Sequence, residues 1–280
     1  MREAPSTLVS PDWLEARLDD PDLAVVEVDV STAAYDAGHV PGAVVWDIYR
    51  DLKTPEYQLR DARELGALLE ASGITPDTTV AFYGYGPAMG YWLLRLAGHR
   101  DARIVDTTRD GWQAERRPWT AARPTVTPTR YPRLRLDPTR RATRAAVERA
   151  ITDPAQVLLD VRTGAEYRGE RFWPSGAPEE HGRAGHVPSA VHLPADLLVD
   201  ADGHFRPPSE LRGLFADRGV DPTVTVVPYC TIGNRAAVAW FVLTELLDYP
   251  RVAVYDGSWA DWGHAADTPV EVAESAPVVG

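Results

Sequence analysis

A seven-residue segment of the chain occurs twice. Residues 38–44 read Gly-His-Val-Pro-Gly-Ala-Val, and residues 185–191, 147 positions further on, read Gly-His-Val-Pro-Ser-Ala-Val. Two tryptophans, Trp112 and Trp259, have the same separation. A repeat with this period divides the 280 residues into two halves, each long enough for a domain. We therefore predict a duplication, with domains at residues 1–117 and 139–280 joined by residues 118–138.

Each half alternates short apolar runs with segments of helical periodicity. The predicted strands are residues 24–28, 78–83, 103–105, 156–161, 223–229 and 251–255. The predicted helices are residues 60–72, 88–97, 139–151, 209–218 and 235–247. Short apolar strands that alternate with helices are typical of a parallel sheet covered by helices on both faces. The expected fold class is therefore α/β, with two such domains in tandem.

The segment between the halves is rich in proline and arginine. It contains five prolines, Pro118, Pro124, Pro128, Pro132 and Pro138, and proline at this density favours an extended chain over a helix. Nine arginines lie between residues 116 and 144, with very few acidic residues among them. Two interpretations follow: a linker that lies across two acidic domains, which we favour, or a basic patch for a charged partner.

Charge and cysteine content exclude several classes of protein. The net charge of −12 repels phosphate backbones, so we expect no nucleic-acid partner. No apolar run of about 18 residues occurs, and residues 1–6 do not resemble a secretory signal, so we expect no membrane association. Cys230 is the only cysteine, which excludes an internal disulfide and a multi-cysteine zinc site. A free thiol and no targeting segment are consistent with the cytoplasm.

Cys230 stands where a predicted strand passes into a predicted helix. The strand at 223–229 is followed by Cys230-Thr-Ile-Gly-Asn-Arg and then by the helix at 235–247. In open parallel sheets, ligands bind beyond the carboxyl ends of strands. A tight turn containing Gly233 can direct backbone N–H groups inward, and a helix N-terminus adds about half a positive charge. Such surroundings favour the thiolate form of a cysteine. A lone cysteine is often a small buried apolar residue instead, but this position favours a nucleophile.

These motifs resemble those of the rhodanese (sulfurtransferase) family, in particular its two-domain thiosulfate and mercaptopyruvate sulfurtransferases. The resemblance covers most of the chain. It rests on Gly-His-Val-Pro in both halves, Asp160-Val-Arg with Glu166-Tyr, the Cys-x-x-Gly-x-Arg loop and Tyr255-Asp-Gly-Ser-Trp. It implies an inactive first domain, and alignment by the 147-residue offset places Tyr83 at the position of Cys230.

The resemblance also implies a mechanism without a cofactor or a metal. Cys230 attacks a sulfur donor and becomes a persulfide, and a thiol, cyanide or a sulfur-carrier protein then takes the sulfur. The loop is closer to the thiosulfate form Cys-Arg-Ile-Gly-Glu-Arg than to the mercaptopyruvate form Cys-Gly-Ser-Gly-Val-Thr, so we expect thiosulfate as donor. The alternatives are mercaptopyruvate as donor, and a persulfide carrier with little turnover of small donors.

The expected donor-binding residues follow the nucleophile in the loop, with one addition from the first domain. They are Thr231, Ile232, Gly233, Asn234, Arg235 and Arg50. Thr231 keeps a hydroxyl donor but stands where thiosulfate enzymes often place a cation, so Thr231→Arg is expected to lower the Michaelis constant for thiosulfate, unless Arg50 already fills that space.

Two arginines have two interpretations each. Arg235 either binds the donor's anionic end or, as we slightly favour, pairs with Asp160 or Glu166 and holds the loop. Arg50 either supplies a cation to the site or is a solvated surface residue.

A cysteine phosphatase is disfavoured because its loop needs Cys-x5-Arg, whereas Cys230 and Arg235 are separated by four residues.

Overall fold

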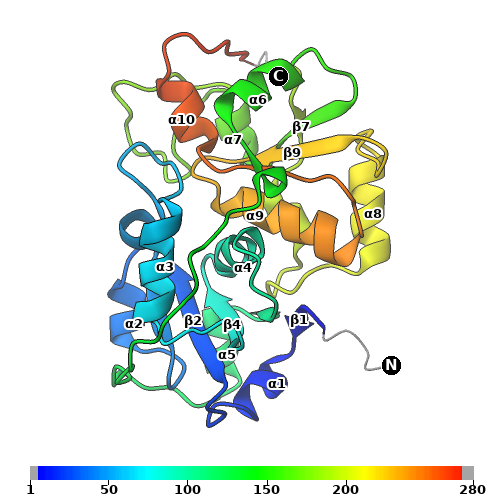
Figure 1. The fold of residues 1–280 in the computed structure, drawn as a ribbon. Helices are drawn as coiled ribbons and strands as arrows, with labels where there is room; N and C mark the ends of the chain where they lie inside the picture. Colours follow the sequence, from blue (N-terminus) through cyan, green and yellow to red (C-terminus); the bar gives the residue numbers. More distant parts are fainter. Residues whose placement is uncertain (1–5, 273–280) are drawn as a thin grey trace. The chain divides into compact units, whose positions relative to one another are not determined.

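The computed structural model describes residues 6–272 of the chain. They form two compact units (Figure 1). Among the described residues, the first unit contains 6–55, 59–137 and 199–205, and the second contains 56–58, 138–198 and 206–272. Each unit therefore includes a short segment from the other half of the sequence.

The first unit is built on one parallel sheet. Its strands, in spatial order, are β1 (Leu8–Val9), β5 (Ala102–Val105), β4 (Thr79–Gly84), β2 (Leu23–Asp29) and β3 (Val44–Asp47). Every neighbouring pair is parallel. The chain thus crosses back after each strand, as expected for an α/β domain.

Helices connect these strands. They are α1 (Pro11–Glu15), α2 (Ala33–Ala37), α3 (Ala62–Ala71), α4 (Pro87–Leu96), α5 (Arg109–Ala114) and a short π-helix, η1 (Ile48–Leu52). Helix α3 begins with a capping box, because Asp61 accepts from the amides of Arg63 and Glu64 while Glu64 reaches back to the amide of Asp61. After α5, residues 121–137 contain no regular element and belong to the first unit.

The second unit repeats this strand order. Strand β7 (Gln156–Asp160) lies between β8 (Val191–His192) and β9 (Thr225–Tyr229), and β10 (Val254–Tyr255) pairs with β6 (Arg141–Ala142). A parallel bridge between Val226 and Val252 brings the two groups together. The order β6-β10-β9-β7-β8 matches β1-β5-β4-β2-β3, so the predicted duplication and the α/β fold class are confirmed.

The helices of the second unit are α6 (Arg144–Ala150), α7 (Gly164–Tyr167), α8 (Pro208–Ala216), α9 (Asn234–Phe241) and α10 (Ser258–His264), with the 3₁₀-helices η2 (Pro138–Arg140) and η3 (Ala195–Leu198) and the π-helix η4 (Val242–Leu246). The predicted helix at residues 139–151 is too long. Arg141 and Ala142 pair with β10 instead, and the side chain of Thr143 caps α6 by accepting from the amide of Ala146. The predicted helix at 235–247 continues past α9 as the π-helix η4.

The structure corrects the alignment of the two halves at the nucleophile. In the first unit Tyr83 lies beside Glu27 in the sheet, and its hydroxyl accepts from the amide of Val40 at 3.0 Å. In the second unit Tyr229 lies beside Asp160, and its hydroxyl accepts from the amide of Val187 at 3.1 Å.

Tyr83 therefore corresponds to Tyr229, not to Cys230. The position of Cys230 is taken in the first unit by Gly84, which follows Tyr83 directly. The 147-residue offset is wrong here by one residue, because Val40 and Tyr83 are 43 positions apart whereas Val187 and Tyr229 are 42 apart. The loop that follows compensates: Gly84 and Pro87 are three residues apart, whereas Cys230 and Asn234 are four apart, so the starts of α4 and α9 are again 147 residues apart.

The tryptophan pair also needs correction. Asp106 and Asp256 each follow the last strand of their unit, and Trp112 and Trp262 each stand six residues later. The indoles of these two tryptophans donate to the carbonyls of Pro118 and Pro269, at 2.9 and 2.8 Å. Trp112 therefore corresponds to Trp262 rather than to Trp259.

A stacked histidine–tyrosine pair occurs in each unit and shows the duplication in side-chain detail. His39 stacks on Tyr35 and His186 stacks on Tyr167, each with ring centroids 3.8 Å apart. In both pairs the histidine Nδ1 lies 2.8 Å from the tyrosine carbonyl. The pairs span 4 and 19 residues respectively, so the second unit contains an insertion between tyrosine and histidine.

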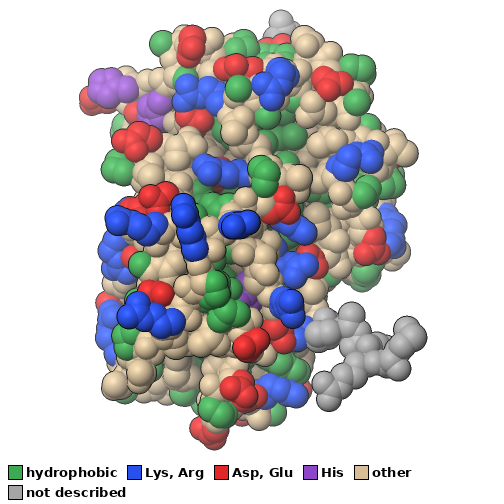
Figure 2. All heavy atoms as spheres, viewed as in Figure 1, with side chains coloured by type: hydrophobic (Ala, Val, Ile, Leu, Met, Phe, Trp, Pro, Cys, Tyr) green, Lys and Arg blue, Asp and Glu red, His purple; other side chains and the backbone are tan. Residues whose placement is uncertain are grey.

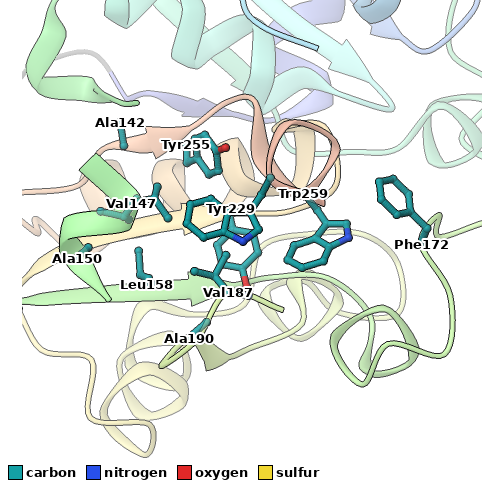
Figure 3. Packing of buried hydrophobic residues seen from close by; sticks show 12 residues of the cluster. Ala142, Val147, Ala150, Leu158, Phe172, Val187, Ala190, Tyr229, Tyr255 and Trp259 are labelled. Atoms are coloured by element: carbon teal, nitrogen blue, oxygen red, sulfur yellow. Dashed lines mark hydrogen bonds between the residues drawn. The ribbon is translucent and has the colours of Figure 1, made fainter. Parts of the chain in front are cut away.

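Aromatic residues dominate the core of the second unit. Tyr229, Tyr255 and Trp259 are fully buried and pack with Val187 and Val147 (Figure 3). Burying large aromatic side chains fixes the end of β9 and the start of α10 with respect to each other. The strand end that precedes Cys230 is therefore held in place by packed aromatic side chains.

Candidate active site

Cys230 lies directly after β9, and α9 begins four residues later at Asn234. Gly233, the N-cap of α9, has a φ of 93°, a left-handed conformation that favours glycine. This turn directs the amide of Gly233 at the sulfur, which it meets at 3.1 Å. The Sγ atom thus accepts a backbone hydrogen bond at the positive end of a helix. The side chain itself is buried.

The start of α10 contacts Cys230 through hydrogen bonds to its backbone. The amide of Cys230 donates to the hydroxyl of Ser258 at 3.1 Å, and that hydroxyl donates to the carbonyl of Tyr255 at 2.7 Å. The amides of Trp259 and Ala260 donate to the carbonyls of Cys230 and Thr231, at 2.9 and 2.8 Å. Sequence reasoning assigned no role to Ser258, although the Asp-Gly-Ser-Trp motif after a strand was a signal for it.

Ser258 has an unusual backbone conformation. Its φ is +54° and its side chain is fully buried. A left-handed conformation costs on the order of 1–3 kcal/mol for a residue that is not glycine. The hydrogen bonds of the hydroxyl, one to Cys230 and one to Tyr255, therefore maintain a strained turn next to the nucleophile.

A buried carboxylate anchors the loop after Cys230. Arg235 donates from Nη1 to Oε2 of Glu166 at 2.9 Å and from Nη2 to Oε1 at 2.8 Å. Thr231 donates its hydroxyl hydrogen to Oε1 at 2.6 Å. The amide and hydroxyl of Thr163 donate to Oε2 at 3.0 and 2.8 Å. Five hydrogen bonds thus converge on one carboxylate that has no exposed surface.

These partners keep Glu166 ionised. Burial by itself raises the pKa of Glu166, but the hydrogen bonds and the charge of Arg235, with the donors Thr231 and Thr163, outweigh it and lower the pKa to about 2. Because the carboxylate is an acceptor only, the hydrogen of Thr231 must point toward it.

These hydrogen bonds bear on two expectations for the loop, the partner of Arg235 and the role of the Thr231 hydroxyl. Of the two carboxylates considered for Arg235, Glu166 is the one that pairs with it. The hydroxyl hydrogen of Thr231 goes to Glu166, and Arg235 Nη2 donates to the same hydroxyl oxygen at 2.7 Å, so donor binding through this hydroxyl stays a prediction. Thr231 is also 2% exposed. Contact of a donor with the backbone of Thr231 stays a prediction.

Asp160 supports the strand rather than the loop. It pairs with Arg162, whose Nη2 donates to Oδ2 at 2.6 Å and whose amide donates to Oδ1 at 2.9 Å, and neither side chain is exposed. The guanidinium lies 4.4 Å from the ring centroid of Trp259. Burial, with Asp160 nearby, raises the pKa of the neighbouring Tyr229 well above its usual value, so the phenol stays neutral. Asp160 thus organises the residue that precedes Cys230.

The other predicted donor-binding residues fall in two places. Ile232 and Asn234 are buried in the loop, and Oδ1 of Asn234 has no hydrogen-bond partner among the residues that the structure describes. Arg50 lies in the first unit, where its guanidinium is 59% exposed and pairs with Asp51 at 2.7 Å. The structure does not relate Arg50 to Cys230, and its role at the site stays a prediction.

The corresponding place in the first unit has a different chemistry. Tyr83 donates to Glu27, and Arg109 donates to the same carboxylate at 2.6 Å. Gly84 then replaces the cysteine, and its φ of 103° belongs to the left-handed region. The first unit thus keeps a buried hydrogen-bonded support but has no nucleophile at the end of β4.

Within residues 6–272, no group of three or more His, Cys, Asp and Glu side chains is arranged to hold a metal ion. No helix in that range has the length and apolar character needed to cross a membrane. The site that the structure describes is built around the sulfur of Cys230, which accepts a hydrogen bond from the amide of Gly233 at the start of α9.

This geometry agrees with the comparisons with known proteins. The model of the rhodanese-like domain matches the chain twice, at residues 10–115 and 143–265. The chain belongs to the rhodanese family and is a sulfurtransferase of the rhodanese type, built from two rhodanese-like domains.

Two relatives match along nearly the whole chain. A protein of Mycobacterium bovis named "Putative thiosulfate sulfurtransferase SseA" is 43% identical over 98% of this chain and 94% of its own length. The "Sulfur carrier protein TtuD" of Thermus thermophilus is 39% identical over 96% of this chain and 98% of its own. Among solved structures, the anaerobic ergothioneine biosynthesis enzyme of Chlorobium limicola in complex with trimethyl histidine has a TM-score of 0.84, at 25% identity, over 96% of this chain and 71% of that chain.

Proposed function

We propose that the protein moves a sulfane sulfur from thiosulfate to a thiophilic acceptor through a persulfide on Cys230. The observation that carries the proposal is the hydrogen bond from the amide of Gly233 to Sγ of Cys230, at 3.1 Å, at the start of α9. A backbone donor and a helix N-terminus stabilise negative charge on sulfur, first on the thiolate and then on the persulfide.

The reaction has two steps. The Cys230 thiolate attacks the outer sulfur of thiosulfate, a new sulfur–sulfur bond forms, and the sulfur–sulfur bond of the donor breaks with its electron pair leaving on sulfite. An acceptor such as cyanide or a thiolate then attacks the outer sulfur of the persulfide, and the electron pair of that bond returns to Cys230. No proton or redox partner is needed, and the steps predict ping-pong kinetics.

Intact mass tests the first step. The protein is incubated with thiosulfate, desalted and weighed, and we expect a gain of one sulfur atom that is absent from Cys230→Ser. Addition of cyanide should remove the extra sulfur and produce thiocyanate. Transfer that survives in Cys230→Ser, or no gain in mass with any donor, would contradict the proposal.

A persulfide carrier is the second candidate, and one observation favours it. The hydrogen of Thr231 is taken by Glu166, and both terminal nitrogens of Arg235 donate to the same carboxylate. The side chains next to Cys230 therefore provide little positive charge for a small dianion. A relative that is named a sulfur carrier protein supports the same candidate.

Steady-state rates separate the two candidates. The rate with thiosulfate and cyanide is compared with the rate at which a protein persulfide, generated on a cysteine desulfurase, transfers its sulfur to Cys230. Fast turnover with thiosulfate supports the enzyme. Transfer from the protein persulfide with negligible turnover of thiosulfate and mercaptopyruvate supports the carrier, and a clear preference for mercaptopyruvate overturns thiosulfate as donor.

A further inference from the structure

A cavity of about 630 Å³ lies in the first unit, between α3 and the extended segment that follows α5. Small residues of α3 and a leucine from the segment make its apolar part, and charged residues stand around them. The lining includes Ala62, Arg63, Gly66, Tyr131, Arg133 and Leu134. Leu134 is buried, which fixes the segment against the helix. The cavity belongs to neither of the two strand ends described above.

Four arginines at this cavity carry unpaired charge. Arg63 and Arg133 line it, and Arg130 and Arg135 stand on the same segment. Their guanidinium groups make no hydrogen bond or ion pair with any residue from 6 to 272. All four are exposed. Figure 2 shows Lys and Arg side chains gathered over α3 and the segment after α5.

Other arginines of the region between the halves behave differently. Arg117 pairs with Asp12, Glu15 and Glu115, and Arg123 pairs with Asp36. These two fit the interpretation of a linker that lies across an acidic domain. Arg130, Arg133 and Arg135 of the same segment have no such partner among the described residues, and they motivate the other interpretation, a basic patch for a charged partner.

Asp61 and Glu70 offset only part of the positive charge of the patch, since two carboxylates stand against four guanidinium groups. Asp61 accepts from the amides of Arg63 and Glu64, both at 2.8 Å, as the cap of α3. Glu70 accepts from the amide of Tyr131 at 3.0 Å. Both carboxylates thus serve the internal structure, while the arginines face solvent. A local excess of positive charge in a chain of net charge −12 attracts negatively charged partners.

The length of the patch favours an extended ligand. An extended, proline-containing segment rises about 3.1 Å per residue, so Arg130 and Arg135 lie on the order of 16 Å apart. This exceeds the size of a single small anion. The apolar part of the cavity, with Leu134 and the small side chains of α3, accommodates an apolar side chain between the charges. A nucleic acid is disfavoured because the chain as a whole is strongly acidic.

We propose that this surface, formed by Arg63, Arg130, Arg133 and Arg135 around the cavity, docks an extended acidic segment of a partner protein. Glutamates or aspartates of the segment pair with the arginines, and an apolar side chain enters the cavity. The proposal does not depend on the sulfur chemistry at Cys230.

Fluorescence anisotropy with a labelled heptapeptide tests the proposal. The peptide alternates four glutamates with three leucines, and the full-length protein is the titrant. We expect saturable binding that weakens when salt is raised, because exposed ion pairs are screened. Arg63→Glu combined with Arg133→Glu should weaken binding by at least about ten-fold.

The matched control is Arg149→Glu combined with Arg212→Glu, two exposed arginines of the second unit that form no ion pair within the described residues. It makes the same change in net charge and should alter binding by less than about two-fold. Circular dichroism and sulfur transfer should match wild type in both variants.

Three outcomes overturn the proposal. The first is equal loss of binding in the two double variants. The second is equal binding of a heptapeptide in which lysine replaces glutamate. The third is no peptide binding alongside tight, saturable binding of tripolyphosphate or of a short oligonucleotide, which would assign the patch to phosphate-bearing ligands.

Discussion

Arg235 and Glu166, 69 residues apart in the sequence, form a bidentate ion pair with N–O distances of 2.8 and 2.9 Å. The carboxylate has no exposed surface and the guanidinium is 17% exposed. Arg235 stands in the first turn of α9, and Glu166 belongs to α7. The pair therefore ties the loop that contains Cys230 to the helix that follows β7, and it fixes where that loop lies.

Glu166→Gln should destabilise the second unit and misplace the loop. Removing one partner of a buried ion pair costs about 3–5 kcal/mol, since the other charge is left without compensation. We expect the free energy of unfolding to fall by that order and kcat for sulfur transfer to fall with it. Urea unfolding and steady-state kinetics measure the two effects.

Glu210→Gln is the matched control. Its carboxylate pairs with Arg206 on the surface, at 3.3 Å and four residues away, and such pairs contribute about 0.3–0.5 kcal/mol. Equal losses of stability in Glu166→Gln and Glu210→Gln would show that the buried pair does not hold the loop.

The same carboxylate predicts how stability depends on pH. The pKa of Glu166 is about 2 in the folded protein, below its usual value of 4.5, so folding favours the ionised form. A group with a lowered pKa stabilises the protein above the unfolded value, and that contribution disappears as pH falls through the folded value. It amounts to about 3 kcal/mol at neutral pH. The difference in unfolding free energy between wild type and Glu166→Gln should therefore be large at pH 7 and shrink between about pH 4.5 and 2. A difference that stays constant over this range contradicts the assignment.

The hydrophobic pattern of the sequence predicted the fold because most strands and helices of both units follow the patterns typical of such elements. The strands β4, β7 and β9 are continuous apolar runs with clear ends, and the structure has them close to the predicted positions. The prediction was wrong where tertiary pairing overrides local preference. Arg141 and Ala142 have good helix propensity but pair with β10 as a strand.

The alignment of the halves failed for a related reason. A single offset cannot follow insertions, and the first half has one more residue than the second between the valine and the tyrosine, 43 positions against 42. The hydrogen bonds of Tyr83 and Tyr229 identify the correct pairs, and these bonds join residues more than 40 positions apart. No local pattern in the sequence reports such contacts.

Cys230 could be predicted as the candidate nucleophile from the sequence, whereas the residues that hold it in place could be predicted only in part. Cys230 is the only cysteine and follows an apolar run, so both composition and position indicated it. Glu166 was named because of the motif it belongs to. Ser258 was missed because its effect is exerted through one hydrogen bond to a backbone amide 28 residues away.

Ser258→Ala tests that hydrogen bond. The substitution leaves the buried amide of Cys230 without an acceptor, which costs roughly 1–3 kcal/mol. We expect lower stability and a lower kcat, because the sulfur loses its fixed position. Ser189→Ala is the control, since Ser189 also has a positive φ of 65° and donates to a carbonyl, that of Ile151, but is far less buried. If Ser258→Ala transfers sulfur as fast as Ser189→Ala, Ser258 does not position the nucleophile.

Tyr83→Phe and Tyr229→Phe form a matched pair across the duplication. Each hydroxyl accepts from a buried valine amide, at 3.0 and 3.1 Å, so each variant should lose about 1–3 kcal/mol of unfolding free energy. Only Tyr229 is followed by the nucleophile, so only Tyr229→Phe should also slow persulfide formation. Rapid mixing with thiosulfate, with the reaction quenched at successive times and the intact mass measured, gives the rate of persulfide formation in each variant. Equal effects on the rate would mean that the strand end before Cys230 is insensitive to its support.

Thr231→Arg gives the sharpest test of the loop, because sequence and structure predict opposite results. Sequence comparison predicts a lower Michaelis constant for thiosulfate, since a cation would follow the nucleophile. In the structure Thr231 is 2% exposed, donates to Glu166 at 2.6 Å and accepts from Arg235 at 2.7 Å. An arginine there places a second guanidinium beside Arg235 in a packed space, which costs at least about 2 kcal/mol. We therefore expect Thr231→Arg to be less stable and to have a lower kcat/KM for thiosulfate. Thr231→Ser, which keeps the hydroxyl, should remain close to wild type, and a folded Thr231→Arg with a raised kcat/KM would show that the loop can open around this residue to receive a donor.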